Sequence, residues 1–173
     1  MDKITYAIEN FKNMQELIRF ADQKAGALIV VYGLVLTITF ETTKNLQFCL
    51  PTGSYLYIVN VLTFIIGFIL YILIFHEVHF LLNSVLKPRL ANNYNPSDSC
   101  LYYFEHIAAK DKSEVMSCFS RLDESNMLSD VATQVYEVSN TLAVKMKMVC
   151  KAIDALFYVL GALVAFLFFV KLL

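Results

Sequence analysis

Charged residues are scarce in this sequence, and neither sign prevails. Lys, Arg, Asp and Glu together make up 17% of its 173 residues, and the formal net charge is −1. Without a basic excess, the composition does not favour nucleic acid as a partner. Hydrophobic residues make up 58% of the chain and the mean hydropathy is +0.57, which is too apolar for a soluble domain of this size. The composition therefore predicts a small integral membrane protein.

Paired cysteines and a secretion signal are also missing. The cysteines lie far apart and lack a histidine at metal-ligand spacing, so neither a zinc site nor a redox pair is indicated. They are Cys49, Cys100, Cys118 and Cys150. The N-terminal residues contain four acids and no short apolar core of the kind that signal peptides carry. We therefore expect the first membrane span to serve as the insertion signal.

Proline and glycine are few, with three and five residues, and this leaves long uninterrupted apolar runs. Residues 25–40 carry no charge and cover about 24 Å as a helix, so they need Thr42 and Thr43 to cross a hydrocarbon core of about 30 Å. Residues 55–75 are uncharged, and residues 155–173 carry only Lys171. The sequence predicts an all-α integral membrane protein with three transmembrane helices, a helical cytoplasmic region and an N-terminal amphipathic helix.

The chain is predicted to divide into six segments. They are an amphipathic helix at 1–24, spans at 25–43, 55–76 and 153–173, an external loop at 44–54 and a cytoplasmic sensing region at 77–152. Pro51 and Gly53 predict a short turn, so the first two spans should form an antiparallel hairpin. Twelve Lys and Arg lie before the first span or between the second and third, against Lys44 and Lys171 elsewhere. The positive-inside rule places the N-terminus in the cytoplasm and the C-terminus outside.

Apolar residues recur at helical spacing in the first twenty-odd positions, at Ile4, Ile8, Phe11, Met14, Leu17, Ile18 and Ala21. This amphipathic helix could lie on lipid headgroups or pack against the middle region. Packing is preferred, because its four acids balance its four bases and weaken lipid binding.

The middle region is predicted to be helical. The second helix should continue beyond Phe75 until Pro88 stops it. A polar loop and two short helices, at 100–111 and 112–123, should follow, the second capped by Ser113. From about Asn126 one long helix should run into the third span with a coiled-coil-like seam. That seam contains Leu128, Val131, Val135, Val138, Leu142, Val149, Ala152 and Leu156, and is broken only at Lys145.

The spans lack the residues that ion-coupled transport or catalysis needs. No charge lies at the centre of a span, which disfavours a proton relay. His76, Glu77 and His79 have a spacing of three rather than the four of zinc proteases, and no third ligand is evident, so no metal site is expected. Neither a nucleophile with its base nor a phosphate-binding glycine loop is present, so we expect no enzyme. Gly26 with Gly33, and Gly161 with Ala165, favour close helix packing.

A nucleotide-like ligand would need aromatic rings for the base and cations for the phosphate. The middle region has both only at Arg89, Tyr102, Tyr103, Phe104, Lys110, Lys112 and Arg121. Tyr103 and Phe104 would equally suit the core of a short helix. These residues permit a ligand site without indicating one.

Three stretches of the sequence resemble one family. "FADQKAGALIVVYG" lies at 20–33, "YYFEHIA" at 102–108 and "VATQVYEVSNTLAVKMKMVCKAID" at 131–154. Together they resemble the transmembrane effector family (PycTM-like) of bacterial Pycsar (pyrimidine cyclase) anti-phage defence systems. The matching positions are Asp22, Lys24, Gly26, Phe104, Ile107, Ala108, Gln134, Tyr136, Ser139, Leu142 and Lys145.

The resemblance implies a function. Phage infection would raise cyclic CMP or cyclic UMP through a pyrimidine cyclase, and the effector would respond by impairing the bacterial inner membrane, so that the infected cell stops growing or dies. It implies the cyclic nucleotide as activating ligand and transfers no catalytic residue, and no other cofactor is expected. From the seam of the last helix we expect a homo-oligomer in the lipid bilayer. Which of the two nucleotides is the ligand stays open.

Within this family reading, Asp22, Lys24 and Gly26 mark the cytoplasmic entry to the first span. Lys145, the polar residue in the seam, is placed to meet such an acid or Glu137 of a neighbouring copy. Contacts between these charged residues would then couple the cytoplasmic sensing region to the membrane spans. Two other hypotheses remain: a constitutive membrane scaffold or channel accessory subunit without a nucleotide response, and a membrane metalloenzyme built around His76, Glu77 and His79.

Overall fold

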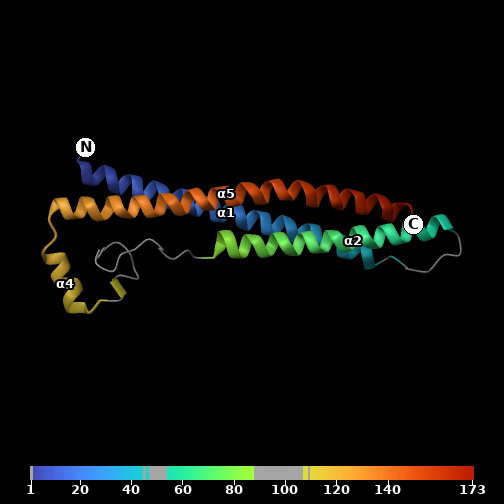
Figure 1. The fold of residues 1–173 in the computed structure, drawn as a ribbon, viewed down its shortest axis with the longest axis horizontal. Coiled ribbons are helices and arrows are strands. Elements are labelled where there is room, and N and C mark those ends of the chain that lie inside the picture. The colour runs from blue at the N-terminus through green and yellow to red at the C-terminus, as the bar shows by residue number, and fades with distance from the viewer. Residues whose placement is uncertain (1, 45, 47–53, 88–106, 109) are drawn as a thin grey trace. The chain divides into compact units, whose positions relative to one another are not determined.

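The computed structural model describes residues 2–44, 46, 54–87, 107–108 and 110–173, and within them it is all-helical (Figure 1). The helices are α1 (Lys3–Lys44), α2 (Ser54–Leu81) with a π-helical extension η1 (Leu82–Leu86), α4 (Lys112–Ser120) and α5 (Glu124–Lys171). Three of them are long and apolar enough to cross a membrane. The predicted fold class is confirmed, and the three candidate spans are consistent with a multi-pass membrane protein.

Helix α1 is one uninterrupted helix of 42 residues. The predicted amphipathic segment and the first span are therefore one element without a joint between them. Most of the predicted apolar positions before the span are half-buried or buried, whereas Leu17 is exposed and lies off that face. Leu17 and Ile18 are adjacent, so a helix can direct only one of them to the same face.

Helix α2 continues beyond its apolar run, as predicted, and ends just before Pro88 in the sequence. Its last turn is wider than an α-helical turn, because the Lys87 N–H donates to the Leu82 carbonyl at 3.0 Å, five residues back. A π-helical turn of this kind holds one extra residue. The sequence predicted the end of the helix and missed this widening.

An acidic residue directly precedes each of the next two helices, α4 and α5. Asp111 is the N-cap residue of α4, although its side chain makes no capping hydrogen bond, so the prediction that Ser113 caps this helix is wrong. Helix α5 begins at Glu124, two residues before the predicted start. There the Asp123 carboxylate accepts a hydrogen bond from the Asn126 N–H at 2.7 Å, which satisfies one of the first free N–H groups. The predicted short helix at 100–111 lies largely outside the described residues.

The chain forms two compact units, and α1 and α5 each contribute to both. Unit 1 consists of Met1–Ala21 and Pro88–Lys145, and unit 2 consists of Asp22–Lys87 and Met146–Leu173. Unit 2 contains the apolar runs of all three long helices.

The buried positions of α5 follow the predicted alternation of three and four residues. They are Val131, Gln134 and Lys145 in unit 1, and Val149, Ala152, Val159, Leu163 and Phe166 in unit 2. At one position the buried seam differs from the prediction: Gln134 is buried, whereas Val135, which was predicted to lie in the seam, is half-buried. Lys145 remains 5% exposed, so the polar interruption lies inside the seam.

Unit 2 has its large apolar side chains on both its inside and its outside. Tyr32, Leu70, Leu81 and Val159 are fully buried, while many rings and branched side chains of the same helices are exposed. A soluble unit of this size would not leave such a surface uncovered. The exposed surface of unit 2 is therefore the surface that faces lipid.

Contacts within unit 2 give the direction of its helices. Tyr32 near the middle of α1 meets Ala152 of α5, and Thr43 near the end of α1 lines a cavity with Phe166 of α5. The two helices therefore run parallel. Helix α2 starts on the side where α1 ends, since Thr63 in the first half of α2 lies at the cavity that Thr43 lines. The first two spans are thus antiparallel, as predicted (Figure 1).

Candidate functional site

Two of the long helices of unit 2, α1 and α5, meet in a polar contact at Tyr32. This tyrosine lies on the buried stripe of α1, and its hydroxyl donates a hydrogen bond to the Ala152 carbonyl of α5 at 3.2 Å. Both residues are fully buried. A buried hydroxyl needs such a partner, because leaving it unpaired costs free energy. The contact holds α1 and α5 at one longitudinal position relative to each other.

Glu77 is a buried acid of α2 in the same unit. Its side chain is buried, with 9% of the residue exposed. One carboxylate oxygen lies 3.1 Å from Nδ1 of His76, whose side chain is 70% exposed. Glu77 is therefore a buried acid that contacts a histidine at the surface.

The three side chains considered for a metal site lie in different environments. Glu77 is buried, whereas His76 and His79 are exposed. His79 interacts with the Asn83 side-chain amide at 3.2 Å. In the described part of the chain, no three His, Cys, Asp or Glu side chains gather as a metal site would require. The geometry thus gives no support to the metalloenzyme hypothesis.

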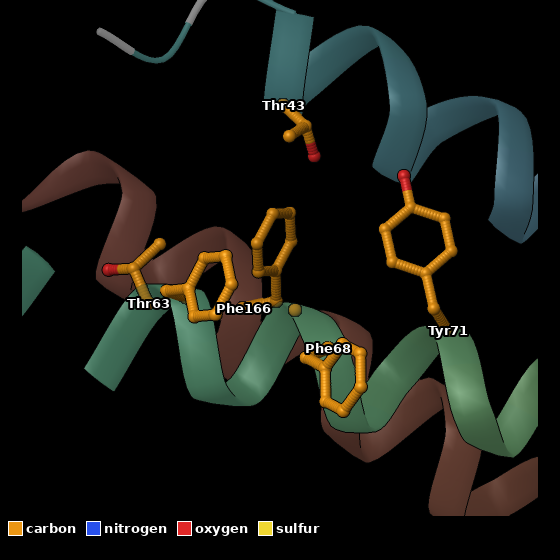
Figure 2. Close-up of a pocket in the computed structure, with 7 residues that line it drawn as sticks. Thr43, Thr63, Phe68, Tyr71 and Phe166 are labelled. Atoms are coloured by element: carbon orange, nitrogen blue, oxygen red, sulfur yellow. The ribbon is translucent and has the colours of Figure 1, made fainter. Parts of the chain in front are cut away.

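A cavity of about 120 Å³ lies farther along the same three helices (Figure 2). Its walls are Thr43 of α1, Phe166 of α5 and, from α2, Thr63, Phe64, Gly67, Phe68 and Tyr71. Thr43 and Thr63 donate their hydroxyl hydrogens to carbonyls of their own helices, at 2.7 and 2.8 Å. The cavity is therefore apolar in its chemistry and suits packing changes rather than catalysis.

Gly67 determines how closely α5 approaches α2 at this cavity. A Cβ atom at this position would lie 2.9 Å from a ring carbon of Phe166. By contrast, nothing lies within 4 Å of the corresponding position at Gly26, Gly33 or Gly161. Among the residues that the structure describes, the close packing predicted at those three glycines is thus not made, and Gly67 was missed.

The predicted ligand residues are only partly described. Arg89, Tyr102, Tyr103 and Phe104 lie outside the described residues. Lys110 is half-buried just before α4, and its Nζ lies 3.8 Å from the Cys118 thiol. Arg121 is exposed at the other end of α4. The ligand site remains a prediction.

The four residues predicted to couple sensing to the membrane have different environments. Asp22 is half-buried, Lys24 is exposed, and Lys145 is buried. Each of the three takes part in an interaction with another residue. Gly26 lies in open space. The pairing of Lys145 with an acid of the first span, or with Glu137 of a neighbouring copy, stays a prediction.

Sequence reasoning missed Tyr32, Glu77 and Gly67. A signal for Tyr32 existed, because it falls at the three-and-four spacing of Ala25, Leu28 and Val35, where a polar group would need a partner. Glu77 was considered as a metal ligand only. Gly67 gave no signal of its own, since which glycine meets a neighbouring ring depends on how the helices are aligned.

Comparison with known proteins agrees with these features. No curated protein and no solved structure matches the chain. A family model described as the Pycsar effector protein domain matches residues 6–172, which is nearly the whole chain and includes all three long helices. The chain belongs to the Pycsar effector protein domain family.

Proposed function

We propose that this protein is an anti-phage effector that responds to cyclic CMP or cyclic UMP and impairs the integrity of the bacterial inner membrane. The observation that carries the proposal is the match of residues 6–172 to the Pycsar effector domain, together with three helices that can span a membrane. The infected cell would stop growing or die. The protein would act as a homo-oligomer and have no catalytic activity.

Two features of α1 and α5 support the transmission of a conformational change along these helices. Helices α1 and α5 are uninterrupted over 42 and 48 residues, and each contributes to both units. A rearrangement that rotates or shifts one end of such a helix is carried to its other end. The ligand would drive this only through a difference in its affinity for two arrangements of the helices.

The seam of α5 has the composition of a helix with more than one arrangement. Gln134 and Lys145 are buried among apolar residues of unit 1. Polar residues at seam positions lower stability and select one register over others. Because these residues lower the stability of the packed seam, the ligand would need less binding energy to shift it to another arrangement.

The ligand would bind in the cytoplasmic region, where rings and cations occur together. Tyr102, Tyr103 and Phe104 would stack on the base, and Arg89, Lys110 and Arg121 would meet the phosphate. The functional partner would be a pyrimidine cyclase, acting through its diffusible product. The N-terminus would be cytoplasmic and the C-terminus external.

The test is leakage of a small dye from liposomes that contain the purified protein, with cyclic CMP, cyclic UMP and cyclic AMP added in turn. We expect leakage with one pyrimidine nucleotide and none with cyclic AMP. Circular dichroism on the same liposomes establishes that the protein is folded. Folded, inserted protein that stays silent with all three nucleotides would contradict the proposal and favour a constitutive scaffold.

A further inference from the structure

The cavity of unit 2 lies among residues that hydrocarbon surrounds. Five of its seven lining residues belong to residues 55–75, the uncharged run of α2, and Phe166 belongs to residues 155–170, the uncharged run of α5. Both helices are long and apolar enough to cross a membrane. The medium next to this cavity is therefore lipid rather than water.

The cavity is partly open, with an exposed rim and a buried floor. Phe64 and Phe68 lie one turn apart on α2, both line the cavity, and they are 61% and 60% exposed. Gly67 is buried, and Phe166 is only 2% exposed. Figure 2 shows the Phe166 ring pointing toward Thr43 of α1. The rim therefore belongs to the lipid-facing surface, and the floor lies inside the unit.

Water is a poor occupant of this cavity, because a buried water needs about two to four polar partners. The hydroxyls of Thr43 and Thr63 already donate to carbonyls of their own helices, at 2.7 and 2.8 Å. The remaining polar side-chain group among the lining residues is the Tyr71 hydroxyl, which Figure 2 shows directed toward α1. One hydroxyl offers too few partners, so the cavity favours an apolar occupant.

The size of the cavity suits part of a hydrocarbon chain. Its volume is about 120 Å³, close to that of apolar cavities of about 150 Å³, which stay dry and take up benzene or xenon. An empty cavity costs free energy, because the atoms that line it lose dispersion contacts. An acyl chain is the material present at the rim, and it restores these contacts without burying a polar group.

We propose that this cavity is a binding site for the acyl chain of a membrane lipid. The chain passes the exposed rings of Phe64 and Phe68 and packs on Phe166. The walls come from α1, α2 and α5, so the site exists only where these three helices are packed together. A bound chain therefore favours this arrangement of the spans over others. The inference goes beyond the proposed function and does not depend on a nucleotide response.

The test is photolabelling of the purified protein in liposomes that contain a trace of a phospholipid with a diazirine in its acyl chain. Light expels dinitrogen from the diazirine, and the resulting carbene inserts into the group that it touches. Mass spectrometry then assigns the label to residues, and no nucleotide is added. Lipid that merely surrounds the unit labels exposed residues such as Ile72 and Phe157, which are 53% and 69% exposed.

An acyl chain in the cavity should also label the buried floor. We expect several times more label on Thr63 and Phe166 than on Leu70 and Val159, which are buried to the same degree but do not line the cavity. Close packing keeps a reagent away from such residues. An excess of the same lipid without the diazirine should lower the label on the floor. Label confined to exposed residues would overturn the inference.

Two adjacent threonines of α1 provide a matched pair of variants. Thr43 lines the cavity and Thr42 does not, and each hydroxyl donates to a carbonyl four residues earlier at 2.7 Å. Thr43→Phe fills the cavity and should lower the label on Thr63 and Phe166 to the level of Val159. Thr42→Phe should leave that label unchanged. Equal labelling of the floor in both variants would contradict the acyl-chain site.

A third variant changes the cavity in the opposite direction and guards against an effect of misfolding. Phe166→Leu widens the cavity, so the label on Thr63 should rise. Circular dichroism and an unchanged label on Ile72 establish that each variant is folded and inserted. A label on Thr63 that falls in Phe166→Leu as it does in Thr43→Phe would also contradict the inference.

The labelling separates an acyl chain from other occupants and from the proposed function. A second copy of the protein, or another part of the same chain, would exclude the lipid and leave Thr63 and Phe166 as unlabelled as Leu70. Protein that never leaks with any nucleotide, although its cavity floor is labelled, would contradict the proposed function and retain the lipid site. Protein that leaks with an unlabelled floor would retain the function and remove the lipid site.

Discussion

The Tyr32 hydroxyl connects two helices of unit 2, α1 and α5, through one hydrogen bond. Its hydroxyl is fully buried and donates to a carbonyl of α5. The hydrogen bond adds stability only at one relative position of the helices, since a shift by a turn would leave the hydroxyl without this partner. A contact of this kind favours one resting arrangement over its neighbours.

We predict that Tyr32→Phe lowers the stability of the resting state. The ring keeps its packing, and the hydrogen bond is lost at a cost of about 0.5–1 kcal/mol. Leakage should then begin at a lower nucleotide concentration. The measurements are thermal unfolding in detergent and dye release over a range of nucleotide concentrations. Tyr158→Phe is the control, because Tyr158 is 75% exposed; equal effects of both variants would contradict the prediction.

Gly67 allows a second test, in which a single methyl group is added. A methyl group there would lie 2.9 Å from the Phe166 ring. We expect Gly67→Ala to destabilise the protein by about 1 kcal/mol, at the low end for overpacking because the adjacent cavity lets the ring move. Gly161→Ala should not destabilise the protein, since no described atom lies within 4 Å of the added methyl group and alanine is the better helix former.

Unfolding in detergent measures both glycine variants. Combining Gly67→Ala with Phe166→Leu should recover part of the loss, because the smaller side chain removes the clash. A double variant no more stable than Gly67→Ala alone would mean that the loss does not come from the clash with the ring. Helix propensity could not explain the loss either, since alanine is the better helix former.

At the scale of elements, the uninterrupted course of α5 is the feature on which signal transfer depends. A proline inside a helix removes a backbone hydrogen bond and clashes with the preceding turn, at a cost of about 3 kcal/mol. Ser139 lies in the part of α5 that belongs to unit 1. In the described hydrogen bonds, its hydroxyl donates only to the Tyr136 carbonyl of the same helix.

We predict that Ser139→Pro abolishes nucleotide-triggered leakage while the protein still inserts into liposomes. The spans keep their apolar runs, and the connection along α5 is broken. Dye release and flotation of the liposomes measure the two properties. Ser139→Ala removes the hydroxyl alone and should respond like the wild type. Normal leakage from Ser139→Pro would show that α5 is not the path of the signal.

The helices themselves could largely be predicted from the sequence. Pro88 gave the end of the second helix, and the apolar stripe of α5 gave its seam, because both depend on neighbouring residues in the chain. The alignment of α1 with α5 could not be predicted. A heptad stripe packs almost equally well after a slip of seven residues, so offsets of 113, 120 or 127 residues look alike in sequence. The actual offset depends on contacts such as that of Tyr32 with Ala152.

The candidate site was predicted less well than the fold for the same reason. Lys145 was correctly placed in the buried seam, since its position follows from its spacing. The contacts of Tyr32 and Gly67 were missed, because they depend on how the helices are aligned along their axes.

At the scale of the whole molecule, the distribution of charge predicts its orientation. Twelve basic residues lie on the side of the N-terminus and the middle region and two elsewhere, so the C-terminus should be external. We expect Leu172→Cys, in a cysteine-free variant, to react with an impermeant thiol reagent added to intact spheroplasts. Ser117→Cys in α4 should react only after lysis. The reverse pattern would contradict the predicted orientation.

The π-helical turn η1 gives the end of α2 a property that an ordinary helix end lacks. It holds one residue more than an α-helical turn, and a single residue corresponds to a rotation of about 100° about the helix axis. The turn therefore directs Lys87, the last described residue of this segment, about one residue's rotation away from the direction that a regular α-helical end would give it.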